Sequence, residues 1–315
     1  LVGSEMCIRD SSQGNQFNRI AVYALLAISL SLIVAVLFGA KYYFSTVARV
    51  PVAMSPVPSQ EASSAVCAAV IDNLPGKFYG HERSDIVEPV PDGVAAWATI
   101  STEATTLRCG VDLPLQYTPY SETTEASGAQ WLQVRDMTPG STMTTWYTVD
   151  RTPVVAVTTH DDGQPDGLDE SLDQLDQADQ QPHAAPLSQL QAVVGDNRSA
   201  CRALDAALPE TLAEDYQRQR ELPEDTAAGT AVWTAPGREA IVLRCGVEPA
   251  PGYAAGEQVQ QVNDVPWFED TTLAPGTTAS TWFALGQDTD IAAHLPQDVA
   301  DSVLVELGDA LGAAD

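Results

Sequence analysis

Two arginines are the residues of this chain best suited to bind a charged ligand. Arg108 and Arg244 each occupy the second position of the motif Leu-Arg-Cys-Gly-Val, in a chain with only 15 basic residues against 43 acidic ones. A guanidinium can bind a carboxylate or a phosphate through two parallel hydrogen bonds. An arginine at such a position can instead lie over a neighbouring tryptophan or pair with a local acid. We expect the structural role to be the commoner one and keep both arginines as ligand-binding candidates.

Tryptophans could supply a second kind of binding surface, because an exposed indole offers a flat apolar face to a sugar ring. Trp131 and Trp267 are the better candidates, since each lies beside a predicted turn. Trp97 and Trp233 stand at strand spacing, where large aromatic side chains more often fill a core. The sequence therefore adds Trp131 and Trp267 to the ligand-binding candidates, with burial in the core as the expected alternative.

Catalytic and metal-binding patterns are missing from the sequence. The four histidines, His81, His160, His183 and His294, have no counterparts at matching positions in the two halves of the chain. The motifs of serine hydrolases, zinc proteases, phosphate-binding loops and dinucleotide-binding turns do not occur. The acidic residues from Asp161 to Glu170 do not match the calcium-binding loop pattern. We therefore expect no catalytic residue, no metal and no cofactor, in a protein that is not an enzyme.

The segments that carry these residues are duplicated within the chain. All six tryptophans form pairs with a constant offset of 136 (233 − 97, 267 − 131, 282 − 146), and Cys109 and Cys245 share that offset. Each copy also opens with Cys-x6-Leu-Pro, at Cys67 and at Cys201, where the offset is 134 (201 − 67). A period of this size is that of a tandem domain pair, because solenoid repeats run to about 20–50 residues.

Four cysteines lie at matching positions in the two copies. They predict one disulfide in each domain, Cys67–Cys109 and Cys201–Cys245, and hence an oxidising compartment. Buried free thiols are the alternative. A zinc site is disfavoured, because two cysteines per copy without a repeated histidine cannot complete a tetrahedral set of ligands.

The N-terminal region contains an apolar run and a segment that does not look native. Residues 1–11 resemble a translated sequencing-adapter artefact, so we set Cys7 aside. Residues 20–40 carry no charge and are long enough to cross a hydrocarbon core of about 30 Å. A cleaved signal peptide is the rival reading, although its apolar region is usually only about 7–15 residues long. We expect a signal-anchor with the N-terminus in the cytoplasm.

The rest of the chain divides into two domains and their connections. The expected parts are residues 1–19 as artefact and short cytoplasmic N-terminus, 20–40 as transmembrane signal-anchor, 41–58 as proline-rich spacer, 59–160 as repeat domain 1, 161–186 as acidic linker, and 187–315 as repeat domain 2. Leu168, Leu172 and Leu175 have helical spacing. They could add a terminal helix to the first domain and thus fold much of the linker into it.

Residue periodicity predicts an α+β fold with two layers in each domain. Helices are expected over Cys67–Leu74, before and after Gly195–Asn197 in copy two, and over Ala300–Leu307. Strands are expected around each Trp97-type tryptophan, around each Leu-Arg-Cys motif, on both sides of each Pro-Gly turn, and near the end of each copy. The prediction is an N-terminal transmembrane helix followed by two tandem domains, each a small antiparallel sheet with helices on one face.

The repeated motifs resemble a known family. The Leu-Arg-Cys-Gly-Val motif, the Cys-x6-Leu-Pro opening and the tryptophan that follows it resemble domain of unknown function thirty-five fifteen, over about residues 60–300. The resemblance implies an actinobacterial cell-envelope protein with an N-terminal signal, lipid attachment or membrane anchor. Duplication and the lack of a lipid-attachment motif depart from the common form of that family. The resemblance implies no activity, since the family has none established.

Charge and organisation together suggest the class of function. A net charge of −28 disfavours binding to nucleic acid and to anionic lipid surfaces. We expect a single-pass cell-membrane protein with extracytoplasmic domains, held by residues 20–40, that interacts without catalysis with an envelope protein or a cell-wall component. The alternatives are a pair of domains that bind a small ligand or glycan, and an envelope hydrolase.

Overall fold

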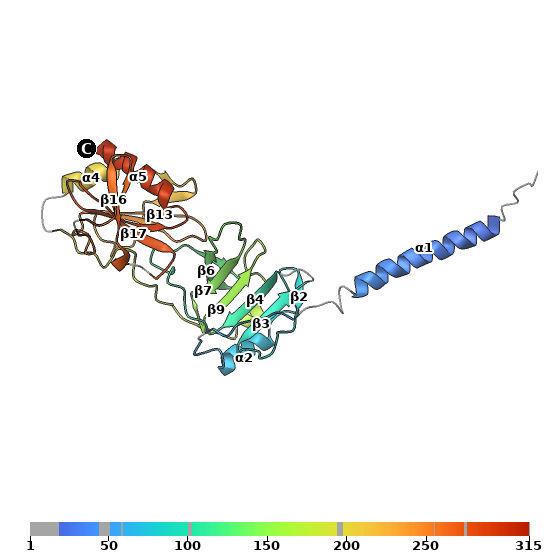
Figure 1. Ribbon diagram of the computed structural model, residues 1–315. Coiled ribbons are helices and arrows are strands. Elements are labelled where there is room, and N and C mark those ends of the chain that lie inside the picture. Colours follow the sequence, from blue (N-terminus) through green and yellow to red (C-terminus); the bar gives the residue numbers. More distant parts are fainter. Residues whose placement is uncertain are drawn as a thin grey trace, which may run out of the picture. The chain divides into compact units, whose positions relative to one another are not determined.

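A computed structural model describes residues 19–43, 51–57, 59–99, 103–193, 198–254, 256–273 and 276–314. By its internal contacts the chain forms two units, residues 1–50 and residues 51–315. The first unit contains helix α1 and the second contains both repeats (Figure 1). The segment expected to be an artefact, residues 1–11, lies outside the described residues.

Helix α1 (Arg19–Tyr42) contains the apolar run. At about 1.5 Å per residue, its 24 residues extend beyond the roughly 30 Å of a hydrocarbon core. Among the described residues it is the one helix that is long and apolar enough to cross a membrane. The predicted span, residues 20–40, lies inside it.

The two repeats contain sheets of the same size and strand order. Each is an eight-stranded antiparallel sheet, ordered β1-β2-β3-β4-β9-β7-β6-β5 in repeat 1 and β11-β12-β13-β14-β18-β17-β16-β15 in repeat 2. The strands of repeat 1 are β1 (Lys77–Phe78), β2 (His81–Arg83), β3 (Val94–Ala98), β4 (Ala104–Cys109), β5 (Thr123–Ala126), β6 (Ala129–Arg135), β7 (Thr144–Thr148) and β9 (Val155–Thr159). Those of repeat 2 are β11 (Thr211–Leu212), β12 (Tyr216–Gln219), β13 (Thr230–Thr234), β14 (Ile241–Cys245), β15 (Gln260–Val262), β16 (Val265–Glu269), β17 (Ala279–Ala284) and β18 (Ile291–Pro296).

Helices cover one face of each sheet, as the sequence predicts. Repeat 1 has α2 (Ala65–Asp72) and the short α3 (Asp169–Leu172), and repeat 2 has α4 (Arg198–Ala207) and α5 (Ala300–Ala314) (Figure 1). Each main core lies between this helix layer and its sheet, and the tryptophans of the sheet belong to it. Each repeat is therefore a two-layer α+β domain.

The first part of the acidic linker packs on repeat 1, which is the alternative that the helical spacing of its leucines allowed. Leu168, Leu172 and Leu175 are buried in the same core as Trp97, so the first part of the acidic linker belongs to repeat 1. Strand β10 (Asp176–Gln177) of the linker pairs with β8 (Arg151–Thr152) and extends this attachment. The helical spacing of these leucines therefore correctly indicated that this part of the linker folds with repeat 1.

A segment that precedes each repeat lies on the face of its sheet opposite the helices. We call these segments strap 1 (residues 51–57) and strap 2 (residues 186–193). In strap 1, Val52 forms a bridge with Ile86, and Met54 is buried against β3. The predicted spacer thus packs on repeat 1 over residues 51–57, whereas its residues 44–50 and 58 lie outside the described residues. The straps show that the face opposite the helices is also covered.

Strap 2 corrects one predicted helix. The sequence predicts a helix whose apolar positions are Leu187, Leu190, Val193 and Val194. Leu187 and Leu190 instead lie in a turn and a bend, and Leu187 has a φ of +63°. Val193 is not helical, and Val194 lies outside the described residues. Leu187 and Leu190 are nevertheless buried, because they pack on the outer face of the sheet against Val232 and Val242. The spacing correctly marked these leucines as buried, but they pack on a sheet without forming a helix.

The outermost hairpins were not predicted. In repeat 1, Ser127 and Gly128 both have positive φ, 46° and 68°, and turn β5 into β6. In repeat 2, Asn263 has a φ of +51° in the turn between β15 and β16. Ser-Gly and Asn-Asp pairs are two-residue hairpin signals, so these short turns could have been found from the sequence.

Candidate functional site

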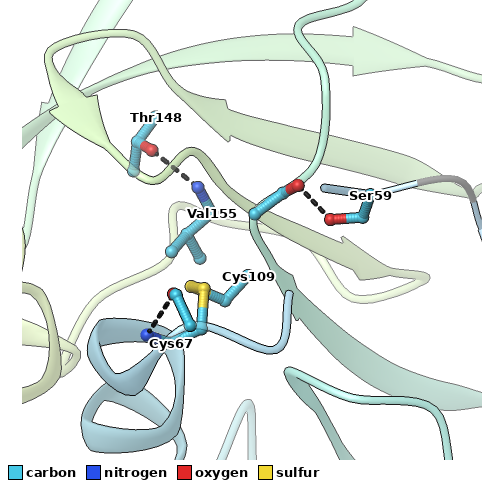
Figure 2. Close-up of a disulfide and its surroundings, with 7 residues drawn as sticks. Ser59, Cys67, Cys109, Thr148 and Val155 are labelled. Carbon is cyan, nitrogen blue, oxygen red and sulfur yellow. Dashed lines mark hydrogen bonds between the residues drawn. A yellow bond between two sulfur atoms is a disulfide. The ribbon is translucent and has the colours of Figure 1, made fainter. Parts of the chain in front are cut away.

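Each repeat contains the predicted disulfide. Cys67–Cys109 joins α2 to β4, and Cys201–Cys245 joins α4 to β14, with Cα atoms 5.5 and 5.6 Å apart. Figure 2 shows the first bridge between Cys67 and Cys109. The Ser64 hydroxyl accepts a hydrogen bond from the Cys67 amide and caps α2. The first bridge is sealed, since both its cysteines are at most 1% exposed. In repeat 2, Cys201 is only half-buried.

The two candidate arginines hold the straps. Arg244 is 8% exposed and donates to the carbonyl oxygens of Leu187 and Leu190 at 2.8 and 2.7 Å. Arg108 is half-buried and donates to the Ser55 carbonyl at 2.9 Å. Burial lowers the pKa of both guanidinium groups. An arginine at this motif position therefore ties the segment that precedes each repeat to the outer face of its sheet.

A different pair of arginines lies over tryptophans. The Arg83 guanidinium is 5.1 Å from the Trp97 ring centre, and that of Arg218 is 5.5 Å from Trp233. Arg218 also forms an ion pair with Asp205. The sequence suggested a cation–π arrangement only for Arg108 and Arg244 of the Leu-Arg-Cys motif, so Arg83 and Arg218 were not predicted.

The tryptophans lie in the core. Trp131 and Trp267, the candidates for a binding platform, both have an exposed fraction of 0%. Trp97 and Trp233 donate their indole N–H groups to the carbonyl oxygens of Pro75 and Pro209, each at 2.9 Å. These bonds explain why each Cys-x6-Leu-Pro opening is followed by a tryptophan at strand spacing. In this structure neither Trp131 nor Trp267 presents an open face to a ligand.

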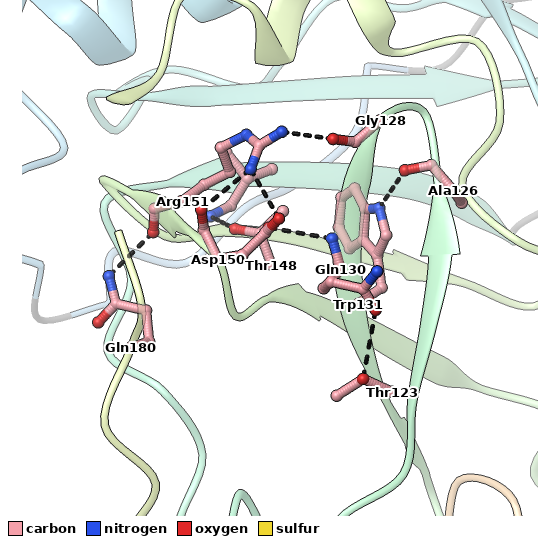
Figure 3. Close-up of polar contacts among 10 residues, drawn as sticks. Thr123, Ala126, Gly128, Gln130, Trp131, Thr148, Asp150, Arg151 and Gln180 are labelled. Carbon is pink, nitrogen blue, oxygen red and sulfur yellow. Dashed lines mark hydrogen bonds and ion pairs between the residues drawn. The ribbon is translucent and has the colours of Figure 1, made fainter. Parts of the chain in front are cut away.

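A buried arginine found only in repeat 1 organises the region around Trp131 (Figure 3). Arg151 is 7% exposed, forms an ion pair with Asp150 at 2.7 Å and donates to the Gly128 carbonyl. Trp131 donates to the Ala126 carbonyl at 2.9 Å, and Gln180 of the linker donates to the Arg151 carbonyl. These bonds engage the guanidinium in holding the β5–β6 turn, so the arrangement is structural.

A second polar cluster, which sequence reasoning missed, lies in the turn between β13 and β14. The Glu239 side chain is 7% exposed, and its Oε1 lies 2.9 Å from Nε2 of His294 on β18. Thr277 donates to the same oxygen at 2.9 Å, and the Tyr216 hydroxyl donates to the Glu239 carbonyl at 3.1 Å. Burial is the main cause that raises the pKa of the Tyr216 hydroxyl, which therefore stays protonated and able to donate.

Two charged groups of this cluster are incompletely bonded. Arg238, next to Glu239, forms an ion pair with Asp298 and lies 4.7 Å above the ring centre of Tyr216. Among the described residues, Oε2 of Glu239 and Nε of Arg238 are buried and have no hydrogen-bond partner. An unsatisfied buried polar group costs about 1–3 kcal/mol, and more when it is charged. We call Arg238, Glu239 and His294 the junction cluster.

The turn that carries Arg238 and Glu239 contacts residues of repeat 1. The Arg135 amide donates to the Gly237 carbonyl at 2.8 Å, and Thr234 donates to Oε1 of Glu122 at 2.5 Å. Gly237 has a φ of +71°, and a Cβ there would lie 2.6 Å from the Arg135 side chain. A cavity of about 40 Å³ lies between these parts and is lined by Glu239, Arg238, Arg135 and Glu122 among others.

Metal binding has no support among the residues that the structure describes. No three His, Cys, Asp or Glu side chains there come together as a set of ligands. His81 pairs with Asp161 at 2.8 Å, and this pair is far in sequence from the His294–Glu239 pair of repeat 2. His81 and His294 thus each have one carboxylate partner, and these two pairs do not occupy matching positions.

The comparisons with known proteins give one match. The model of the family described as "Protein of unknown function (DUF3515)" matches the chain twice, over residues 26–183 and over residues 171–314. A search of curated proteins finds no match, and neither does a search of solved structures. Because the two matches together cover residues 26–314 of a 315-residue chain, the protein belongs to the DUF3515 family and contains its domain as a tandem duplication.

Proposed function

We propose that this protein is anchored in the cell membrane by α1, holds both repeats on the extracytoplasmic side, and acts there by binding another envelope component without catalysis. The observation that carries the proposal is a disulfide at the same position in each repeat, downstream of an apolar helix. Disulfides persist in oxidising compartments and are rare in the cytosol.

Two sheet edges support a role in binding. Strands β5 and β15 are the last strands of their sheets, and each pairs with one neighbour among the described residues. The free edge of a strand carries N–H and C=O groups that can add an extended segment of a partner. A small ligand or glycan held by Arg108, Arg244, Trp131 and Trp267 is less well supported, because these arginines hold the straps and these indoles are buried.

Location can be tested by thiol labelling. The exposed residue Gln258 is replaced by cysteine, and intact cells are treated with a membrane-impermeant maleimide. We expect labelling without lysis, and no reaction of Cys67, Cys109, Cys201 or Cys245 after denaturation without reduction. Labelling that requires lysis, or four reactive native thiols, would contradict the extracytoplasmic location.

Binding at the sheet edge can be tested by crosslinking in the cell. A photo-crosslinking residue is placed at the exposed position Glu125 on β5, with Asp301 on α5 as an exposed control. We expect Glu125 to capture a defined envelope protein and Asp301 to capture none. Recovery of only uncrosslinked monomer from the β5 position, and from the matching position Gln261 on β15, would count against the interaction role.

A further inference from the structure

The junction cavity has the chemistry of a small binding site. Glu239 contributes a carboxylate whose side chain is more than nine-tenths buried, and its Oε1 is already bound to His294 and Thr277. Its Oε2 has no partner among the described residues, although the side chain lines the cavity. A group that donates a hydrogen bond could bind Oε2 and so satisfy both oxygens of this carboxylate.

The guanidinium of the neighbouring Arg238 can bind a hydrogen-bond acceptor rather than a donor. Arg238 uses its terminal nitrogens toward Asp298 and Asp215, and its Nε–H is buried without a partner in the described part of the chain. Arg135, an exposed residue of repeat 1, lines the same cavity. In the part of the chain that the structure describes, its guanidinium forms no ion pair. A hydrogen-bond acceptor with negative charge would satisfy this side of the cavity.

Charge of both signs limits the class of ligand. A simple anion would meet the carboxylates of Glu239 and Glu122, and a simple cation would meet Arg238 and Arg135. A ligand that carries a donor and an acceptor of opposite charge avoids both conflicts. A cavity of about 40 Å³ has room for more than one water molecule, which needs roughly 10–15 Å³, and for a group of few non-hydrogen atoms.

We propose that the cavity between the repeats binds the ammonium and carboxylate groups of a compact zwitterion of the α-amino acid class, the ammonium at Glu239 and the carboxylate at Arg238 and Arg135. Because residues of both repeats line the site, the single-domain form of this fold would lack half of it. The site thereby gives the duplicated chain a function that one repeat does not have. This inference does not depend on the sheet-edge proposal.

Glycine is the probe, and the full-length protein in detergent is titrated by ligand-observed NMR. A ligand of this size should bind with a dissociation constant of about a millimolar. We expect saturable binding of glycine and much weaker binding of methylammonium and of acetate, each of which carries one of its two groups. Absence of saturable glycine binding, or equal binding of the three probes, would overturn the proposal.

Variants locate the site. Glu239→Gln should weaken glycine binding at least tenfold, whereas Glu103→Gln, at the matching position of repeat 1 (239 − 136), should leave it unchanged. Arg135→Met keeps the alkyl contact with Gly237 and removes the charge, so glycine binding should fall severalfold in a folded protein. Equal affinities of Glu239→Gln and Glu103→Gln would overturn the assignment. If Glu239→Gln does not fold, unchanged binding by Arg135→Met would overturn it instead.

Discussion

The outer face of the sheet is covered differently in the two repeats. In repeat 1 a small cluster of Met54, Val94 and Ala96 lies beneath strap 1, and Thr145 and Thr158 share a hydrogen bond of 2.9 Å on neighbouring strands. In repeat 2 the same face is a second apolar core.

The second core contains the two leucines of strap 2, residues of β13, β14, β16, β17 and β18, and Tyr120 from repeat 1. Strand β14 is accordingly buried at every position, whereas burial alternates along β4. Two copies with one strand order thus differ in what their second face does. Strand order, disulfide and strap arginine are therefore common to both repeats, whereas the outer face of repeat 2 also contacts repeat 1.

Removing a disulfide should cause the largest loss of stability, and the loss should be about the same in each repeat. The bridges span 42 and 44 residues, so removing either pair by double Cys→Ser replacement should cost about 4 kcal/mol in the chain-entropy model. Chemical denaturation of the two double variants measures this loss.

The two disulfides should be reduced at different rates even though their contributions to stability are similar. Cys67 and Cys109 are sealed, whereas Cys201 is half-buried, so mild dithiothreitol followed by alkylation and mass spectrometry should modify repeat 2 first. Equal rates of reduction in the native protein would show that the exposure of Cys201 does not control access.

Replacing the strap arginines, Arg108 and Arg244, should destabilise the protein less than removing a disulfide, and by different amounts in the two repeats. Arg244→Met removes two charge-assisted hydrogen bonds in a buried setting, and Arg108→Met removes one at a half-buried position. We expect losses of about 3 and 1 kcal/mol in the free energy of unfolding, respectively. A near-neutral Arg244→Met in thermal and chemical denaturation would contradict the structural role and revive Arg244 as a ligand-binding residue.

The matching tryptophans should give the smallest difference. Trp131 donates to the Ala126 carbonyl, whereas Nε1 of Trp267 is buried without a partner among the described residues. Replacement by Phe removes ring volume at both sites but a hydrogen bond at only one. Trp131→Phe should therefore destabilise the protein by about 1 kcal/mol more than Trp267→Phe, as measured by denaturant midpoint and slope. The reverse order would show that packing outweighs the hydrogen bond.

The residue pattern determined the frame of this protein. Constant offsets of tryptophan and cysteine indicated the duplication, and matched cysteines predicted the two disulfides that the structure contains. Helical and alternating periodicity established a helix layer on a sheet, because apolar spacing follows from the geometry of each element. These features depend on local sequence or on residues that recur at fixed distances.

Tertiary structure alone decided what each side chain contacts. The same leucines at positions 187 and 190 fit a helix or a turn packed on a sheet, and the presence of the Arg244 guanidinium and the outer face selected the turn. Glu239, Asp298 and Arg135 are far apart in sequence and carry no motif. Their meeting at one cavity depends on how two folded repeats contact each other, which hydrophobic periodicity and residue spacing do not encode.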